Sequence, residues 1–388
     1  MERILINSDA DILQSKAINY LRFPLALLVV SIHFNTELIE SPTTVGENLY
    51  NIITCAGSMV IARVAVPMFF LFSGYFYFYK VKEFTLKEYT DKTKKRFKTL
   101  FLPYIYWNLI AFSLFAFKIL FDSCFNGEPI EEFYNYLKTF SYHIFWDSHS
   151  WETTKQFFGL TINITEDAGP INVTLWFLRN LIILSIASPI IYLLFKKLGK
   201  VCIAFLSVIY LMGTFNNVSI YSFYGVFYFS VGAYMSINNY IISDCFGKYR
   251  TIIWALYAIL LPLCVYLFIS HKQDVLSYIF PATILIGVIS VYNLMHYLVE
   301  TRLYDNQMPI LARASFFIYC IHQLSICYRC GVVLPSKITH WLFGSYQSVA
   351  DIVAYLVGPF VVAGVILVIY TIMNKFTPKL LGALTGSR

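Results

Sequence analysis

Two residues with side chains able to do chemistry stand eleven positions apart in the segment "YLRFPLALLVVSIHFN" (residues 20–35), with no charged residue between them. Arg22 can bind a phosphate or carboxylate, and His33 can accept a proton from a hydroxyl group. On an α-helix, eleven residues bring the chain back to within about 20° and advance it by about 16 Å. The spacing therefore predicts that both side chains look into one cavity at different depths. The ordinary alternative for His33 is a hydrogen-bonded packing role.

Further cationic or titratable residues lie inside apolar segments, whereas the 22 Asp and Glu residues avoid the central parts of these segments. The residues are Arg63, Lys118, Arg179, Arg329 and His322. An ionised group at membrane depth costs several kcal/mol unless it faces a polar cavity. The pattern predicts a cationic cavity that is completed by an anionic ligand. For Arg22 and Lys118, near helix ends, snorkelling to lipid headgroups is the alternative.

The composition predicts the elements that must position these residues. The 388-residue chain is 58% hydrophobic and 13% charged, with a mean hydropathy of +0.63, which is too apolar for a soluble protein of this length. Apolar windows long enough to cross a bilayer predict an all-α, polytopic membrane bundle of about ten transmembrane helices. These windows are 17–38, 58–79, 100–121, 171–195, 199–215, 220–239, 251–270, 276–298, 313–334 and 348–373. We expect a single membrane domain over residues 1–388, with an outer insert at about 122–170.

The distribution of Lys and Arg predicts the orientation in the membrane. With ten spans and an N-terminus inside, the inner segments hold twenty Lys and Arg residues and the outer segments hold four. Eight of the twenty lie in the run 80–98. Because positive residues stay on the cytoplasmic side, we expect an inner-membrane protein with both termini in the cytoplasm. The net charge of +7 then comes from the Lys and Arg residues of the inner segments, which face the membrane surface, and does not indicate nucleic-acid binding. Residues 1–15 lack the apolar core of a cleavable signal peptide.

Four further segments occur in an order and spacing that resemble the integral-membrane acyltransferase family 3. They are "VPMFFLFSGYFYF" (66–78), "KKRFKTLFLPYIYW" (94–107), "LWFLRNLI" (175–182) and "ASFFIYCIHQL" (314–324). Together with the Arg-to-His spacing of the first helix, the resemblance covers residues from about 16 to 370. It implies transfer of an acetyl or other acyl group from a cytoplasmic acyl-CoA to a hydroxyl of an extracytoplasmic glycan or lipid-linked sugar. Acyl-CoA, the lipid bilayer and the glycan are the expected partners, and no metal is expected.

The resemblance implies roles for individual residues on the donor side. It makes His33 the catalytic histidine, acting as general base or as acyl carrier, with Arg22 as its partner. Ser73 and Gly74 match a small-residue element that lets the pantetheine arm pass close to the backbone. Arg96 matches the first arginine of a basic element, while the second basic position falls on Lys98 or Thr99 and departs from the pattern. The alternative for Gly74 is a helix contact.

The fourth segment departs from the pattern of many members, which carry a glutamate there. It offers Trp176, Arg179 and Asn180 and so resembles the branch of enterobacterial-common-antigen and capsule acetyltransferases. A carboxylate partner for His33 would come from the outer insert, where Glu166 and Asp167 are nearest in sequence; both are otherwise ordinary loop residues. The remaining candidates are assigned to the acceptor side: Arg63, Trp176, Arg179, His322 and Arg329.

A polysaccharide or lipid-linked-sugar transporter is the main alternative function. Ten spans around a cationic cavity would suit it, but proton-coupled carriers usually keep Asp or Glu in their spans. A purely structural partner would give no reason for Arg22 and His33 to share a helix face. The sequence leaves the acyl group, the acceptor and the oligomeric state open.

Overall fold

The computed structural model of the chain describes residues 9–34, 38–157, 160–212, 223–303, 309–324, 327 and 333–387. Between 149 and 168 the description covers the backbone and not the side chains. Arg329 lies outside the described residues, and Glu166 and Asp167 are described by their backbone alone.

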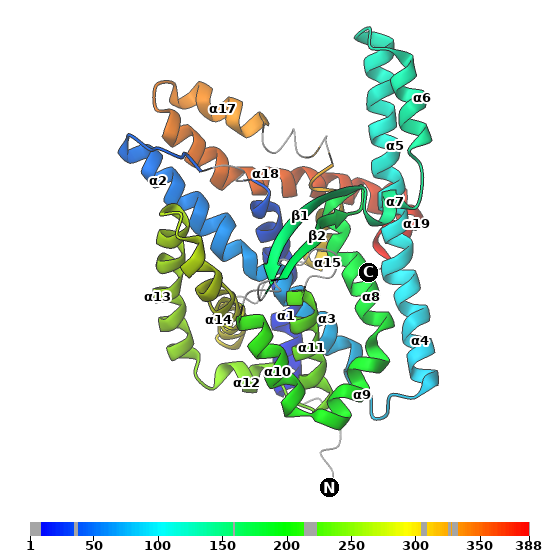
Figure 1. The fold of residues 1–388 in the computed structure, drawn as a ribbon, viewed down its shortest axis with the longest axis vertical. Coiled ribbons are helices and arrows are strands. Elements are labelled where there is room, and N and C mark those ends of the chain that lie inside the picture. Colours follow the sequence, from blue (N-terminus) through cyan, green and yellow to red (C-terminus); the bar gives the residue numbers. More distant parts are fainter. Residues whose placement is uncertain are drawn as a thin grey trace.

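The first half of the chain is helical up to a short hairpin in the outer insert (Figure 1). Its elements are α1 (Asp9–Ile32), α2 (Val45–Thr54), η1 (Cys55–Ile61), η2 (Ala62–Val64), α3 (Ala65–Phe78), α4 (Leu86–Arg96), η3 (Phe97–Phe101), α5 (Leu102–Phe125), α6 (Ile130–Lys138), α7 (His143–Trp146), β1 (His149–Phe157) and β2 (Leu160–Gly169). The two strands pair antiparallel, with Trp151 opposite Glu166.

The second half of the described chain is helical throughout. Its elements are η4 (Val173–Leu175), α8 (Trp176–Ile186), α9 (Ser188–Leu198), α10 (Lys200–Leu211), α11 (Phe223–Ile237), α12 (Ile242–Gly247), α13 (Arg250–Ile269), α14 (Gln273–Glu300), α15 (Pro309–Ile321), α17 (Leu334–Phe343), α18 (Gln347–Phe376) and α19 (Pro378–Thr385). The predicted class, a helical polytopic membrane bundle, is therefore confirmed, with the β1–β2 hairpin as an addition in the insert.

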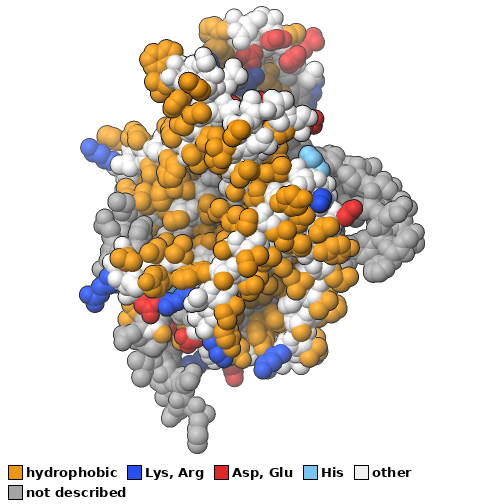
Figure 2. All heavy atoms as spheres, turned by 90° about the vertical axis from the view of Figure 1, so that its left-hand side faces the viewer, with side chains coloured by type: hydrophobic (Ala, Val, Ile, Leu, Met, Phe, Trp, Pro, Cys, Tyr) orange, Lys and Arg blue, Asp and Glu red, His pale blue; other side chains and the backbone are white. Residues whose placement is uncertain are grey.

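Six helices are long and apolar enough to cross a membrane, and the pair α8 and α9 makes a seventh if the two count as one span. Each of the ten predicted windows contains a helix, but α10, α11 and α15 are shorter than a bilayer is thick. The α8–α9 pair bends by 59° next to Pro189, which lacks the N–H that a continuous helix needs. The count of ten spans stays a prediction. Figure 2 shows one face of the molecule, on which hydrophobic side chains cover the middle as a surface in contact with lipid would.

Helix α1 runs through the middle of the bundle and contacts α3, α14, α15 and α18 (Figure 1). Its buried side chains, among them Ile18, Leu21, Leu25 and Val29, recur every three or four residues along one side. Helix α1, which carries Arg22 and ends one residue before His33, is thus fixed by contacts with these four helices.

Helices α3 and α11 approach each other backbone to backbone. A Cβ atom on Gly74 would lie 2.0 Å from the carbonyl oxygen of Phe229, and one on Gly232 would lie 2.0 Å from that of Leu71. Small residues at such crossings let two membrane helices gain van der Waals contact along their backbones. Gly74 therefore makes the helix contact that the sequence left as its alternative role.

We expect Gly74→Ala to lower the melting temperature of the detergent-solubilised protein, because the new methyl group must push α11 away from α3. Overpacking of this kind costs about 1–3 kcal/mol. Gly364→Ala on α18 is the matched control, since nothing lies within 4 Å of its Cβ position. It should be neutral, or stabilising by up to about 1 kcal/mol through helix propensity. Equal melting temperatures for the two variants would contradict the close approach.

Candidate active site

Two cavities lie between the helices. The first, which we call the inner cavity because residues of the basic run 80–98 line it, has a volume of about 560 Å³ and is bounded by α1, α3, α4, α8, α15 and the residues after α19. The outer one has a volume of about 410 Å³ and is bounded by the end of α1, η2, α11 and α14, with contributions from α8 and α15. Both volumes fall in the range of small-molecule sites in proteins.

The inner cavity is strongly cationic. Five of its lining side chains are basic, and no Asp or Glu belongs to the described part of its lining. These side chains are Arg22, Lys92, Lys95, Arg96 and Arg313. The Arg96 guanidinium lies 5.5 Å above the Tyr77 ring, which holds it at the cavity wall by a cation–π contact. Lys92 also pairs with Glu88 outside the cavity, at 3.2 Å. An anionic ligand would complete this cluster.

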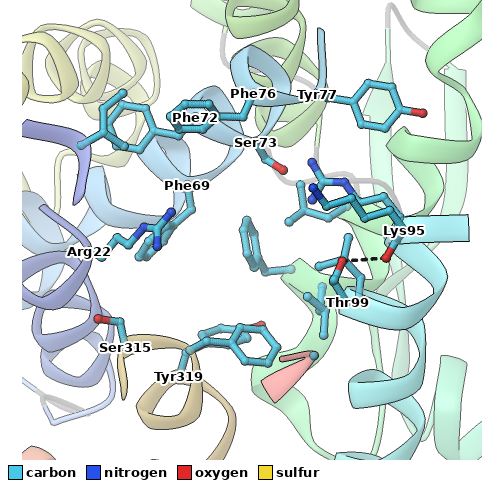
Figure 3. Close-up of a pocket in the computed structure, with 18 of the residues that line it drawn as sticks. Arg22, Phe69, Phe72, Ser73, Phe76, Tyr77, Lys95, Thr99, Ser315 and Tyr319 are labelled. Atoms are coloured by element: carbon cyan, nitrogen blue, oxygen red, sulfur yellow. Dashed lines mark hydrogen bonds between the residues drawn. The ribbon is translucent and has the colours of Figure 1, made fainter. Parts of the chain in front are cut away.

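The view into the inner cavity shows which elements supply its wall (Figure 3). Arg22 enters from α1, Ser73 from α3, Lys95 and Thr99 from α4 and η3, and Tyr319 from α15. The hydroxyl group of Ser73 points into the cavity. Its neighbour Gly74 is not part of the lining, because it faces α11.

The end of the described chain closes part of the inner cavity, which the sequence did not predict. Gly386 and Ser387 belong to the lining. Gly386 has φ +67°, and a Cβ atom on it would lie 2.7 Å from the Cα of Thr99. The indole N–H of Trp107 donates to the Leu384 carbonyl at 2.9 Å and so ties α19 to α5. The glycine that follows this short apolar helix is the sequence feature that could have predicted the turn, because glycine favours the left-handed conformation at which many helices end.

His33 and Arg63 share the outer cavity with Trp176. Arg63 lies in η2, a 3₁₀ turn between the π-helix η1 and α3, and its guanidinium contacts the Met59 sulfur at 3.6 Å. Helices with such irregular turns often line functional sites, because the extra residue turns a side chain to a new face. Within the described residues, this cavity also contains no Asp or Glu.

A wall of two aromatic side chains separates the cavities. Phe177 from α8 and Tyr319 from α15 line both, and their ring centres are 5.7 Å apart. Arg22 and His33 therefore face different cavities, and the predicted shared cavity is divided. The helical spacing predicted that both side chains lie on one side of a helix, but it carried no information about side chains that other helices insert between them.

Hydrogen bonds hold the wall in place. The Tyr319 hydroxyl donates to the Thr174 carbonyl. The Thr174 hydroxyl donates to the Asn172 side-chain oxygen at 2.8 Å, and the Asn172 amide group donates to the Cys320 carbonyl at 3.0 Å. The network links η4 to α15 and so fixes the Tyr319 ring. Because its groups are buried, water does not compete for these hydrogen bonds.

His33 and His322 come together although 289 positions separate them in the sequence. His33 directly follows α1, and its ring centre is 5.3 Å from that of His322, which directly follows α15. His322 is buried, with 3% of its surface exposed, and its Nδ1 lies 2.9 Å from the Tyr319 carbonyl oxygen. His322 thus lies next to the predicted catalytic histidine and is not part of the lining of either cavity.

Other predicted acceptor residues differ in their surroundings. Trp176 lines the outer cavity and contacts the Tyr224 ring at 5.9 Å. Arg179 lines neither cavity: it is buried, donates to the Trp146 carbonyl and lies 5.3 Å above the Trp146 ring. It therefore fastens α7 of the outer insert to α8. Whether Glu166 or Asp167 reaches His33 stays a prediction. No cluster of three metal-ligating side chains occurs among the described residues.

Comparison with known proteins adds the family. A family model described as "Acyltransferase domain" matches residues 15–373. The chain is similar to the succinoglycan biosynthesis protein ExoH of Rhizobium meliloti (strain 1021), with 22% identity over 98% of this chain and 94% of that protein. No solved structure matches the chain.

We expect cysteines placed in the two cavities to react with a membrane-impermeant thiol reagent from opposite sides of the membrane. Ser73→Cys tests the inner cavity and Ser277→Cys the outer one, in a background that lacks the exposed Cys124 and Cys245. Ser188→Cys, at a fully buried position, should not react from either side. Labelling of both cavity cysteines from one side would refute the dividing wall.

Proposed function

The chain belongs to the acyltransferase family whose model covers it, and we propose that it moves an acyl group from cytoplasmic acyl-CoA to a hydroxyl of a cell-surface glycan or lipid-linked sugar. One observation carries this proposal: a cationic inner cavity without described carboxylates meets, at the wall of Phe177 and Tyr319, an outer cavity that contains His33. A donor that is anionic at one end and neutral at its reactive end suits such an arrangement.

The inner cavity is the donor site in this proposal. Coenzyme A carries phosphate groups at one end of a long, narrow, neutral arm that ends in the thioester. Arg22 and Arg96 bind the phosphates, because arginine forms strong bidentate hydrogen bonds with such groups. Ser73 offers its hydroxyl to the arm, along which amide groups need partners. Acetyl-CoA is the simplest donor, and the inner cavity also leaves larger acyl groups possible.

The inner cavity opens to the cytoplasm in this proposal. The twenty Lys and Arg residues of the inner segments support that orientation, and Lys92, Lys95 and Arg96 belong to the basic run 80–98. Both termini are then cytoplasmic, and the protein lies in the cytoplasmic membrane. Acyl-CoA is made in the cytoplasm, so its phosphates meet the cations at the entrance.

Transfer takes place at His33. The thioester carbonyl passes between Phe177 and Tyr319 when the Phe177 ring turns aside. Neutral His33 takes the proton of the acceptor hydroxyl while the hydroxyl oxygen bonds to the carbonyl carbon. Arg63 stabilises the resulting oxyanion. The carbon–sulfur bond then breaks, and the thiolate leaves with the proton from His33. Attack by His33 itself, through an acyl-histidine, remains the second route.

The acceptor enters from the outer side. Trp176 and Tyr224 offer aromatic faces on which sugar rings stack, and Gln273 and Ser277 offer hydrogen bonds to hydroxyl groups. The similarity to a protein named for succinoglycan biosynthesis supports a polysaccharide or its lipid-linked precursor as the acceptor. The family assignment disfavours the transporter alternative, since a transporter needs no acyl donor.

We expect His33→Gln to lower kcat by about 100-fold or more, because general-base catalysis contributes roughly 10²–10⁴ and an amide accepts no proton at neutral pH. His33→Ala should behave alike. The assay follows acyl transfer to purified lipid-linked glycan, with folded protein matched by gel filtration. A loss of only a few-fold in both variants would leave His33 as a packing residue and remove the basis of the mechanism.

We expect Arg22→Gln and Arg96→Gln each to raise KM for the acyl-CoA by tenfold or more, since a hydrogen bond to a charged group contributes about 1.5–3 kcal/mol. The acceptor KM should stay unchanged. Arg250→Gln is the matched control, because Arg250 pairs with Glu300 at 3.2 Å and lines neither cavity. An unchanged donor KM in both cavity variants would return Arg22 to the class of snorkelling residues.

A further inference from the structure

A buried ring nitrogen of His322 has no hydrogen-bond partner among the described residues. The nitrogen is Nε2, and the side chain is almost completely buried. Buried polar atoms in proteins nearly always find a partner, so an unpaired one at the edge of a reaction site calls for an explanation. The outer cavity beside it offers no described carboxylate that could orient His33.

The surroundings of the other nitrogen fix the tautomer of His322. Its Nδ1 lies 2.9 Å from the Tyr319 carbonyl oxygen and 3.2 Å from the Ile318 carbonyl oxygen. Both partners only accept hydrogen bonds, so Nδ1 carries the proton. They belong to the last turn of α15, and the Ile318 carbonyl also accepts the backbone N–H of His322 at 3.1 Å. In the neutral ring Nε2 then has a free lone pair and acts as an acceptor.

His33 is the ring that can satisfy this acceptor. Two imidazoles joined by an N–H···N bond of about 3 Å have ring centres about 5 Å apart, and the observed separation is 5.3 Å with planes at 39°. No hydrogen bond joins the two described rings, so His33 must turn its ring about the Cβ–Cγ bond to make one. His33 lines the outer cavity, which leaves room for that turn.

We propose that His322 is a positioning residue that takes the role of a carboxylate, none of which belongs to the described lining of the outer cavity. Its Nε2 accepts the N–H of His33 and turns the other His33 nitrogen toward the acceptor hydroxyl. The proposal rests on the proposed function of His33. When His33 takes the hydroxyl proton it becomes an imidazolium with two N–H groups, one of which stays bound to Nε2. The proton from the hydroxyl then passes to the departing thiolate, and both rings return to their neutral forms.

The test compares two substitutions to amide residues, each of which keeps the hydrogen-bonding group of one of the two His322 ring nitrogens. In His322→Gln the side-chain oxygen reaches the place of Nε2 and keeps an acceptor for His33. In His322→Asn the amide N–H reaches the place of Nδ1 and keeps the bond to the α15 carbonyls, without an acceptor at Nε2. We expect the Gln variant to keep kcat within about tenfold of the wild type. We expect the Asn variant to lose about 100-fold in kcat with an unchanged donor KM.

Rates are compared per folded protein, measured by gel filtration in detergent. If the Asn variant does not fold, His322→Leu serves as the acceptor-free variant. An active Asn or Leu variant, or a Gln variant as impaired as the acceptor-free one, would overturn the proposal. If His33→Gln is inactive in the same assay while His322→Asn is fully active, the proposed function stands and only the pairing fails. A fully active His33→Gln would refute the proposed function itself.

Discussion

A cationic side chain inside a membrane protein is stable only where water or an anion can reach it, because desolvation without a partner costs more than packing returns. The five basic side chains of the inner cavity meet that condition, because they line an open space and none of them is buried. Regular helices pack at axial distances of about 8–10 Å and leave little space between them. The cavities lie instead beside interrupted helices: η2, which precedes α3, supplies Arg63 to the outer cavity, and η3, which separates α4 from α5, supplies Thr99 to the inner one.

Much of the fold followed from the sequence because hydrophobicity over a bilayer-length window is a strong signal. The windows located the helices, whereas the spacing of Arg22 and His33 predicted one shared cavity and the two residues line different ones. The wall of Phe177 and Tyr319 was not predictable. The chain has 35 Phe and 30 Tyr, and nothing in the sequence around these two residues distinguishes them from the others. The neighbourhood of His33 and His322 depends on how α1 and α15 cross, which no local pattern encodes.

Residues that are adjacent in the sequence or of the same type can have different roles, which only the groups around them in the structure reveal. Ser73 and Gly74 belong to one sequence element, yet one lines the inner cavity and the other presses against α11. Arg63 and Arg179 were both assigned to the acceptor. Arg63 lines the outer cavity, whereas Arg179 is occupied by Trp146. A membrane arginine thus carries little information about its role until the groups around its guanidinium are known.

The aromatic wall between the cavities has a consequence for the membrane as an electrical insulator. Two cavities placed end to end would shorten the hydrocarbon barrier and invite ions to leak down their gradient. Phe177 and Tyr319 interrupt that route with apolar ring faces, which a hydrated ion cannot cross without losing its water. A neutral acyl group needs no such shell. In the proposed reaction, the same two rings would let the membrane potential persist while an acyl group passes between the cavities.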